Sequence, residues 1–131
     1  MTKYLLILGL LAIVAIAWAC KPTSDAYKTV GVDEFEQLIS NQEDVVLVDV
    51  RTSSEFSEGH LRDAILIDWK KDGFMEDARF LLPKERTIAV YCRSGRRSAT
   101  AADSLAADGY HVVNLDGGII AWEKAGKEVV K

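Results

Sequence analysis

One short segment of the sequence combines a nucleophile with several cations. It consists of Cys92, Arg93, Ser94, Gly95, Arg96, Arg97 and Ser98. A cysteine thiolate is a strong nucleophile, and nearby arginines stabilise it and attract anions. Glycine at position 95 permits backbone conformations that other residues resist. The combination favours a reactive Cys92 thiolate over a structural cysteine in a basic turn.

The residues on either side of this segment predict how it is held. Residues 87–91 form a β-branched run typical of a buried strand, and a helix is expected to begin at Arg97 or Ser98 and to end at Gly109. A short connection from a strand end to a helix start turns backbone N–H groups toward one point, and the helix N-terminus adds about half a positive charge. We therefore expect the thiol of Cys92 to have a depressed pKa.

Strands and helices are expected to alternate along the rest of the chain. Apolar runs predict strands at 29–32, 45–50, 64–67, 87–91 and 111–115. Helical spacing predicts helices around 35–39, after Thr52, at 74–81, at 98–106 and at 119–124. This order predicts an α/β fold of three layers, with a central parallel β-sheet covered by helices on both faces. Ligands of such sheets lie at the carboxyl ends of the strands.

Two helix starts carry pairs with the spacing of a capping box. The first pair is Asp33 with Glu36, an acidic variant of the pattern, and the second is Thr52 with Glu55. Each pair predicts that a side chain satisfies N–H groups at the start of its helix.

Two charged residues near the end of the 45–50 strand are supporting candidates for the site. Asp49 either orients an arginine of the loop or begins a turn, and Arg51 pairs with Asp49 or with Glu55. His60 is expected to hydrogen-bond a backbone turn rather than to act as an acid or base. The sequence has no histidine and cysteine cluster for a metal and no glycine-rich phosphate loop, so no metal or other cofactor is expected.

The first 19 residues have the pattern of a bacterial secretory signal. Lys3 precedes residues 4–19, all of which are apolar except Gly9, and this run is shorter than the roughly 20 residues of a membrane-spanning helix. The small residues at the end of Ala17-Trp18-Ala19 suit an ordinary signal peptidase. A lipoprotein signal is favoured over this mode, because the run leads directly into Cys20, which would then carry the lipid.

These features divide the chain into a signal peptide at 1–19, a lipidated Cys20 with a polar tether at 20–27, and a folded domain at 28–131. The domain would be held at a membrane of the bacterial cell envelope and would face the periplasm or the cell surface. With Cys20 lipidated, Cys92 has no cysteine partner. The 49% hydrophobic and 27% charged residues fit one globular domain, and the net charge of −4 excludes a general nucleic-acid binder.

The chain from about Val30 to Gly126 resembles a single-domain rhodanese of the thiosulfate sulfurtransferase type. The motifs that carry the resemblance are Val48-Asp49-Val50-Arg51, Glu58-Gly59-His60-Leu61, Cys92 to Ser98, and Leu115-Asp116-Gly117-Gly118 with Trp122. The loop fits the pattern Cys-Arg-x-Gly-x-Arg/Thr of thiosulfate-type members. It does not fit the Cys-Gly-Ser/Thr-Gly-Val-Thr loop that is usual in mercaptopyruvate-type members.

The resemblance implies a rhodanese-like fold and a two-step transfer of sulfur. Cys92 would take the outer sulfur of a small anionic donor such as thiosulfate, carry it as a persulfide and pass it to cyanide or a thiol. Arg97 is then the best candidate for binding the donor, whereas Arg93 and Arg96 either attract the anion or are merely solvated.

A phosphatase is disfavoured, and two other functions remain open. Related phosphatases have a Cys-x5-Arg loop, but Arg97 gives Cys-x4-Arg in this chain, and Tyr91 stands where phosphatases commonly have histidine. A non-catalytic rhodanese module would only bind a partner, and such modules often lack the cysteine. A sulfur carrier would form the same persulfide on Cys92 and deliver the sulfur to another protein.

Overall fold

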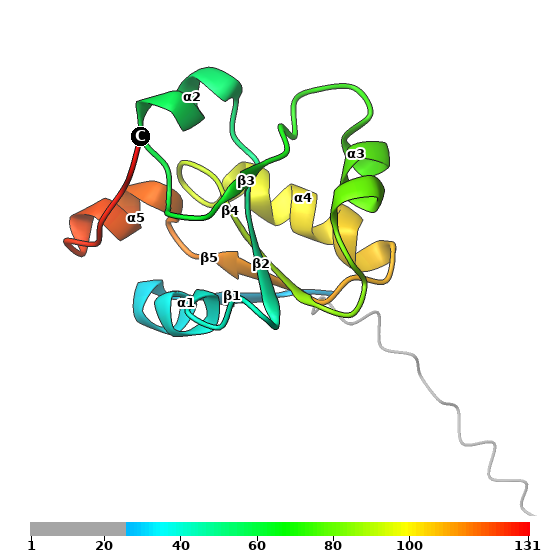
Figure 1. Ribbon diagram of the computed structural model, residues 1–131, viewed down its shortest axis with the longest axis horizontal. Helices are drawn as coiled ribbons and strands as arrows, with labels where there is room; N and C mark the ends of the chain where they lie inside the picture. The colour runs from blue at the N-terminus through cyan, green and yellow to red at the C-terminus, as the bar shows by residue number, and fades with distance from the viewer. Residues whose placement is uncertain (1–25) are drawn as a thin grey trace, which may run out of the picture.

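The computed structural model describes residues 26–131, which fold around one parallel β-sheet (Figure 1). Its strands are β1 (Lys28–Val30), β2 (Val45–Asp49), β3 (Ile65–Leu66), β4 (Thr87–Tyr91) and β5 (Val112–Leu115). They lie in the order β1-β5-β4-β2-β3, and every neighbouring pair is parallel. The helices are α1 (Val32–Ile39), α2 (Ser53–Glu58), α3 (Phe74–Leu81), α4 (Arg96–Ala107) and α5 (Gly118–Lys124).

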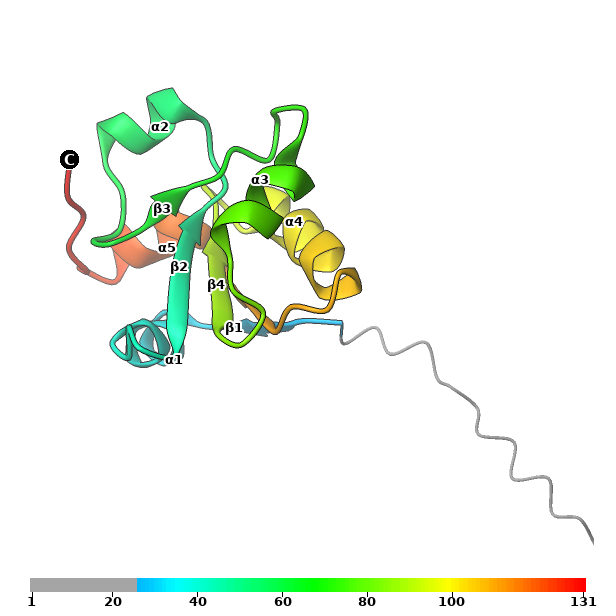
Figure 2. The same ribbon diagram turned by 45° about the vertical axis from the view of Figure 1, so that its right-hand side comes forward.

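Helices cover both faces of the sheet and enclose two separate cores (Figure 2). The core beneath α3 and α4 includes Phe74 and Val90, and the core beneath α1 and α5 includes Phe35 and Tyr91. Val90 and Tyr91 are neighbours in β4, so alternation along the strand sends one side chain to each face. Burying a large apolar side chain stabilises the fold by about 1.5–3 kcal/mol, and both cores therefore hold the central strand in place.

The carboxyl ends of the parallel strands share one edge of the sheet. α2, the loop after β4 and the turn after β5 all lie at this edge (Figure 1). β4 is hydrogen-bonded to β2 on one side and to β5 on the other. Cys92 directly follows β4, so it lies between the connections that leave these two neighbouring strands.

The observed elements confirm the expected three-layer α/β fold with small shifts of their ends. α4 begins at Arg96, earlier than the predicted start at Arg97 or Ser98. Gly95 adopts a left-handed conformation with φ of 95° and turns the chain into the helix at once. The earlier start places Ser98 within the first turn of α4.

One of the two predicted capping boxes is wrong and the other is confirmed. α1 begins at Val32 and has Gly31 at its N-cap without a side-chain cap, so Asp33 lies inside the first turn. Its charge there still favours the helix N-terminus. In α2 the hydroxyl of Thr52 accepts from the N–H of Glu55, and the Glu55 carboxylate accepts from the N–H of Thr52.

The expected signal segment at 1–19 and the lipidation site Cys20 lie outside the described residues. Within residues 26–131 no helix is both long and apolar enough to cross a membrane. Tyr27, near the start of the described residues, packs against the core beneath α3 and α4.

Candidate active site

Cys92 lies at the base of the loop that joins β4 to α4. Only 1% of its surface is exposed. The loop is short, since α4 begins at Arg96, directly after the left-handed turn at Gly95. The first N–H groups of a helix have no partners within the helix, and here they lie beside the cysteine.

Hydrogen-bond donors surround the sulfur of Cys92. The N–H of Gly95 donates to Sγ at 3.1 Å, and the buried hydroxyl of Ser98 donates at 3.3 Å. Burial has the largest single effect on the thiol and raises its pKa. Hydrogen bonds from the Ser98 hydroxyl and from the N–H groups of Ser98, Gly95 and Ser94 together outweigh burial, so the pKa is lowered. The sequence predicted this direction, and hydrogen bonds from the loop are its main source.

The turn between β5 and α5 packs against the loop and is hydrogen-bonded to it through the backbone. The N–H of Ile119 donates to the carbonyl of Cys92 at 2.9 Å, and the N–H of Ile120 donates to the carbonyl of Arg93 at 3.2 Å. Gly118 has φ of 59°, and a Cβ atom there would lie 2.4 Å from the Arg93 oxygen. Glycine is required at this position because the two backbones approach so closely.

The three loop arginines have different surroundings. Arg93 and Arg96 are exposed, but Arg97 is half-buried and forms a two-pronged ion pair with Glu55. Its Nη1 and Nη2 atoms each lie 2.8 Å from a different oxygen of that carboxylate. The pairing with Arg97 lowers the pKa of Glu55 to about 2. Arg97, the expected donor-binding residue, therefore has a carboxylate on its guanidinium in this structure.

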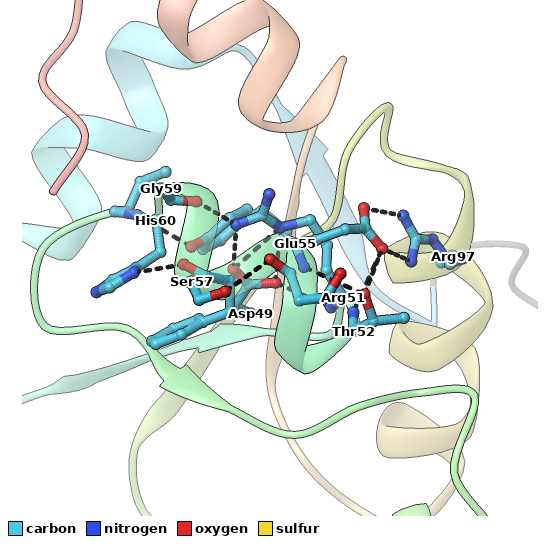
Figure 3. A network of polar contacts seen from close by, with 12 residues as sticks. Asp49, Arg51, Thr52, Glu55, Ser57, Gly59, His60 and Arg97 are labelled. Atoms are coloured by element: carbon cyan, nitrogen blue, oxygen red, sulfur yellow. Dashed lines mark hydrogen bonds and ion pairs between the residues drawn. The ribbon is translucent and has the colours of Figure 1, made fainter. Parts of the chain in front are cut away.

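Asp49 and Arg51 form a buried ion pair beside the loop (Figure 3). Arg51 Nη2 lies 2.7 Å from Asp49 Oδ2, and its Nε bonds both carboxylate oxygens. Nη2 also donates to the carbonyl of Gly59 at 2.6 Å. Asp49 therefore orients Arg51 and not a loop arginine, and Arg51 pairs with Asp49 and not with Glu55. The pair fixes the chain on both sides of α2.

Glu55 is the residue near the loop that the sequence did not identify as part of the site. Its spacing from Thr52 indicated a helix cap, but Arg97 is 42 positions away and no local pattern joins the two. His60 behaves as expected, because its Nδ1 lies 2.9 Å from the carbonyl of Phe56. Its ring also stacks on Phe56 at a centroid distance of 3.7 Å.

Among the described residues, the arrangement suited to nucleophilic chemistry lies at this loop. Within residues 26–131 no three side chains of histidine, cysteine, aspartate or glutamate gather as metal ligands. A hollow of about 700 Å³ lies at the opposite, amino end of the sheet, where Ala26, Thr87 and His111 contribute to its lining. That hollow has no cysteine in its lining, so the arrangement suited to nucleophilic transfer is the one around Cys92.

Comparison with known proteins gives one consistent result. Residues 31–125 match the family model of the rhodanese-like domain. The chain is 38% identical over 99 residues to a sulfurtransferase of Allochromatium vinosum, covering 75% of this chain and 90% of that protein. It is 30% identical over 109 residues to thiosulfate sulfurtransferase GlpE of Pseudoalteromonas translucida, with coverage of 81% and 98%.

A solved structure agrees with the sequence relatives. The rhodanese-like domain protein from Staphylococcus aureus superposes with a TM-score of 0.66 at 31% identity, covering 79% of this chain and 99% of that one. The fold of the described residues is thus the rhodanese-like α/β fold.

Proposed function

The chain belongs to the rhodanese-like domain family, and from this premise we propose that it transfers sulfane sulfur from thiosulfate or a similar anion, with Cys92 as the nucleophile. Several relatives at 30–38% identity are named sulfurtransferases, which supports a transferase of this family. The observation that carries the proposal is the set of donors around the Cys92 sulfur, with two exposed arginines at the rim of the same loop.

In the first step the Cys92 thiolate attacks the outer sulfur of thiosulfate. A bond forms between Cys92 Sγ and that sulfur, the sulfur–sulfur bond of thiosulfate breaks, and sulfite leaves with the bonding electron pair. In the second step cyanide or a thiolate attacks the outer sulfur of the persulfide and releases the Cys92 thiolate. Each step conserves charge and needs no oxidant or cofactor.

The loop suits both anionic forms of the cysteine. Burial excludes water, and donors already directed at the sulfur stabilise a negative charge without rearrangement. Arg93 and Arg96 would attract the anionic donor to the mouth of the loop. The acceptor is a nucleophile, either cyanide or a thiol.

The experiment measures thiocyanate formed from thiosulfate and cyanide, together with the mass of the protein after thiosulfate alone. We expect turnover by the wild type and a mass gain of one sulfur atom. Cys92→Ser should lose both, whereas Ser94→Ala, which changes an exposed loop residue, should keep the added sulfur. An inactive wild type, or a Cys92→Ser protein that still turns over, would reject the proposal.

We also propose that the mature protein begins at a lipidated Cys20 and works in the bacterial cell envelope. The support is the apolar run at 4–19, which leads directly into Cys20. The lipid would attach the domain to a membrane and leave it facing the periplasm or the cell surface.

A further inference from the structure

The Glu55 carboxylate binds the Nη1 and Nη2 edge of the Arg97 guanidinium, an edge that can also bind oxyanions. Carboxylates and oxyanions bind arginine best when two parallel N–H groups meet two oxygens. Glu55 pairs with one such edge of Arg97, the Nη1 and Nη2 edge, at 2.8 Å for each contact. The Glu55 carboxylate is fixed in turn by the hydroxyl of Thr52 at 3.0 Å. Thr52 thus holds the Glu55 carboxylate that pairs with Arg97.

The surroundings of the pair show that it is not simply a surface contact. About a quarter of each side chain is exposed, and Arg97 follows Cys92 by only five positions. α2, which carries Glu55, buries none of its own side chains. Packing of α2 therefore does not account for a glutamate that reaches across to α4.

We propose that Glu55 is a positioning residue that competes with substrate anions for Arg97. By holding the guanidinium in a neutral pair, it leaves anion recognition to the loop N–H groups and to Arg93 and Arg96. It thereby keeps dianions such as thiosulfate from binding too tightly beside Cys92. This inference rests on the proposed function, because it assumes that dianions enter this loop.

Glu55→Gln isolates the charge of the carboxylate. Glutamine also satisfies the capping box, so the substitution keeps the cap of α2 and frees Arg97. The probe is sulfate, which has the shape and charge of thiosulfate but no sulfane sulfur to transfer. Its affinity is measured as protection of Cys92 from iodoacetamide, with ionic strength kept constant by chloride.

We expect sulfate to protect Glu55→Gln at concentrations about fivefold lower than it protects the wild type. This is the upper end of what one charge contact contributes at a partly exposed site. The KM for thiosulfate should fall by a similar factor without any rise in kcat, and this separation of the two constants is not expected if Glu55 only stabilises the fold. Unchanged or weaker protection by sulfate would overturn the proposal.

Two further variants test the route through Arg97. In an Arg97→Gln background, Glu55→Gln should have no additional effect on sulfate protection, and additive effects would contradict the proposal. Thr52→Ala loosens the cap of α2 and removes one contact of the Glu55 carboxylate, but it keeps the negative charge beside Arg97, so sulfate should bind it more weakly than it binds Glu55→Gln. If Thr52→Ala reproduces the tighter binding, the effect comes from α2 and the proposal fails.

Protection by sulfate requires no turnover, which separates this inference from the proposed function. A wild type without sulfurtransferase activity would reject the proposed function. Tighter sulfate binding in Glu55→Gln would still establish the competition for Arg97.

Discussion

Ser98 is the side chain that contributes most to stabilising the thiolate of Cys92. Burial alone would keep this cysteine protonated, and the Ser98 hydroxyl is the strongest of the hydrogen bonds that reverse the effect. The hydroxyl is fully buried and donates to Sγ at 3.3 Å. The reactivity of Cys92 therefore depends more on the neutral hydroxyl of Ser98 than on the charged arginines of the loop.

Replacing Ser98 by alanine should make Cys92 less reactive at neutral pH. A hydrogen bond to a charged group is worth about 1.5–3 kcal/mol, and about 1.4 kcal/mol corresponds to one pKa unit, so the thiol pKa should rise by about one to two units. The measurement is the pH dependence of alkylation by iodoacetamide. Thr100→Ala is the matched control, since its hydroxyl is exposed and contacts only the Arg96 carbonyl. A Ser98→Ala profile that coincides with the wild type would contradict this assignment.

At the scale of elements, the loop depends on the turn before α5 as much as on its own residues. Two N–H groups of α5 hold the carbonyls of Cys92 and Arg93. The Gly117-Gly118 motif, which looks like an ordinary turn in the sequence, thus packs against the loop that holds Cys92.

Gly118→Ala should disrupt the loop far more than a similar change elsewhere. The new Cβ would lie 2.4 Å from the Arg93 oxygen, and backbone cannot move aside cheaply, so we expect a loss of about 3 kcal/mol in unfolding free energy together with loss of activity. Gly126→Ala is the control, because its φ of 78° is similar but no atom lies within 4 Å of the added carbon. It should cost only about 1 kcal/mol. Urea unfolding measures both, and equal losses would show that conformation, not contact, determines the cost.

The link between α2 and α4 should weaken in acid. The pKa of Glu55 is about 2 in the folded protein, below its ordinary value, so its pairing with Arg97 stabilises the fold above about pH 5 and is lost as the pH falls toward 2. Solvent screening limits the contribution to about 1 kcal/mol. Urea unfolding of the wild type and Glu55→Gln should therefore differ at pH 7, and the difference should shrink as the pH falls toward 2. A difference that persists at low pH would show that the carboxylate charge is not its source.

Local patterns predicted the elements, but contacts between distant segments could not be read from the sequence. The β-branched run before Cys92 predicted β4, and this prediction is confirmed. The spacing of Thr52 and Glu55 predicted the capping box of α2, which is also confirmed. Both patterns act over only a few residues. The pairing of Glu55 with Arg97 depends on where α2 crosses the sheet edge, which no spacing encodes. The predicted box at Asp33 was wrong because Gly31 already starts α1.

At the scale of the whole molecule, the proposed membrane attachment should be separable from the folded domain. Cys20→Ala should release the protein into the soluble fraction of a bacterial host, because the proposed lipid is its only expected anchor. The unchanged protein should incorporate an alkyne fatty acid, and sulfurtransferase activity should be equal in both forms, since Cys92 is unaffected. An unlabelled wild type with a free amino terminus at Cys20 would indicate ordinary signal cleavage.

Because all the strands are parallel, the domain has an amino pole, where the strands begin, and a carboxyl pole, where they end. The chain enters at Ala26, beside the amino ends of β4 and β5, while Cys92 lies at their carboxyl ends. Residues 20–25 span at most about 20 Å, so an anchored Cys20 would keep the amino pole near the bilayer. The persulfide would then point into the aqueous compartment, where an acceptor as large as a folded protein has room to approach without displacing lipid.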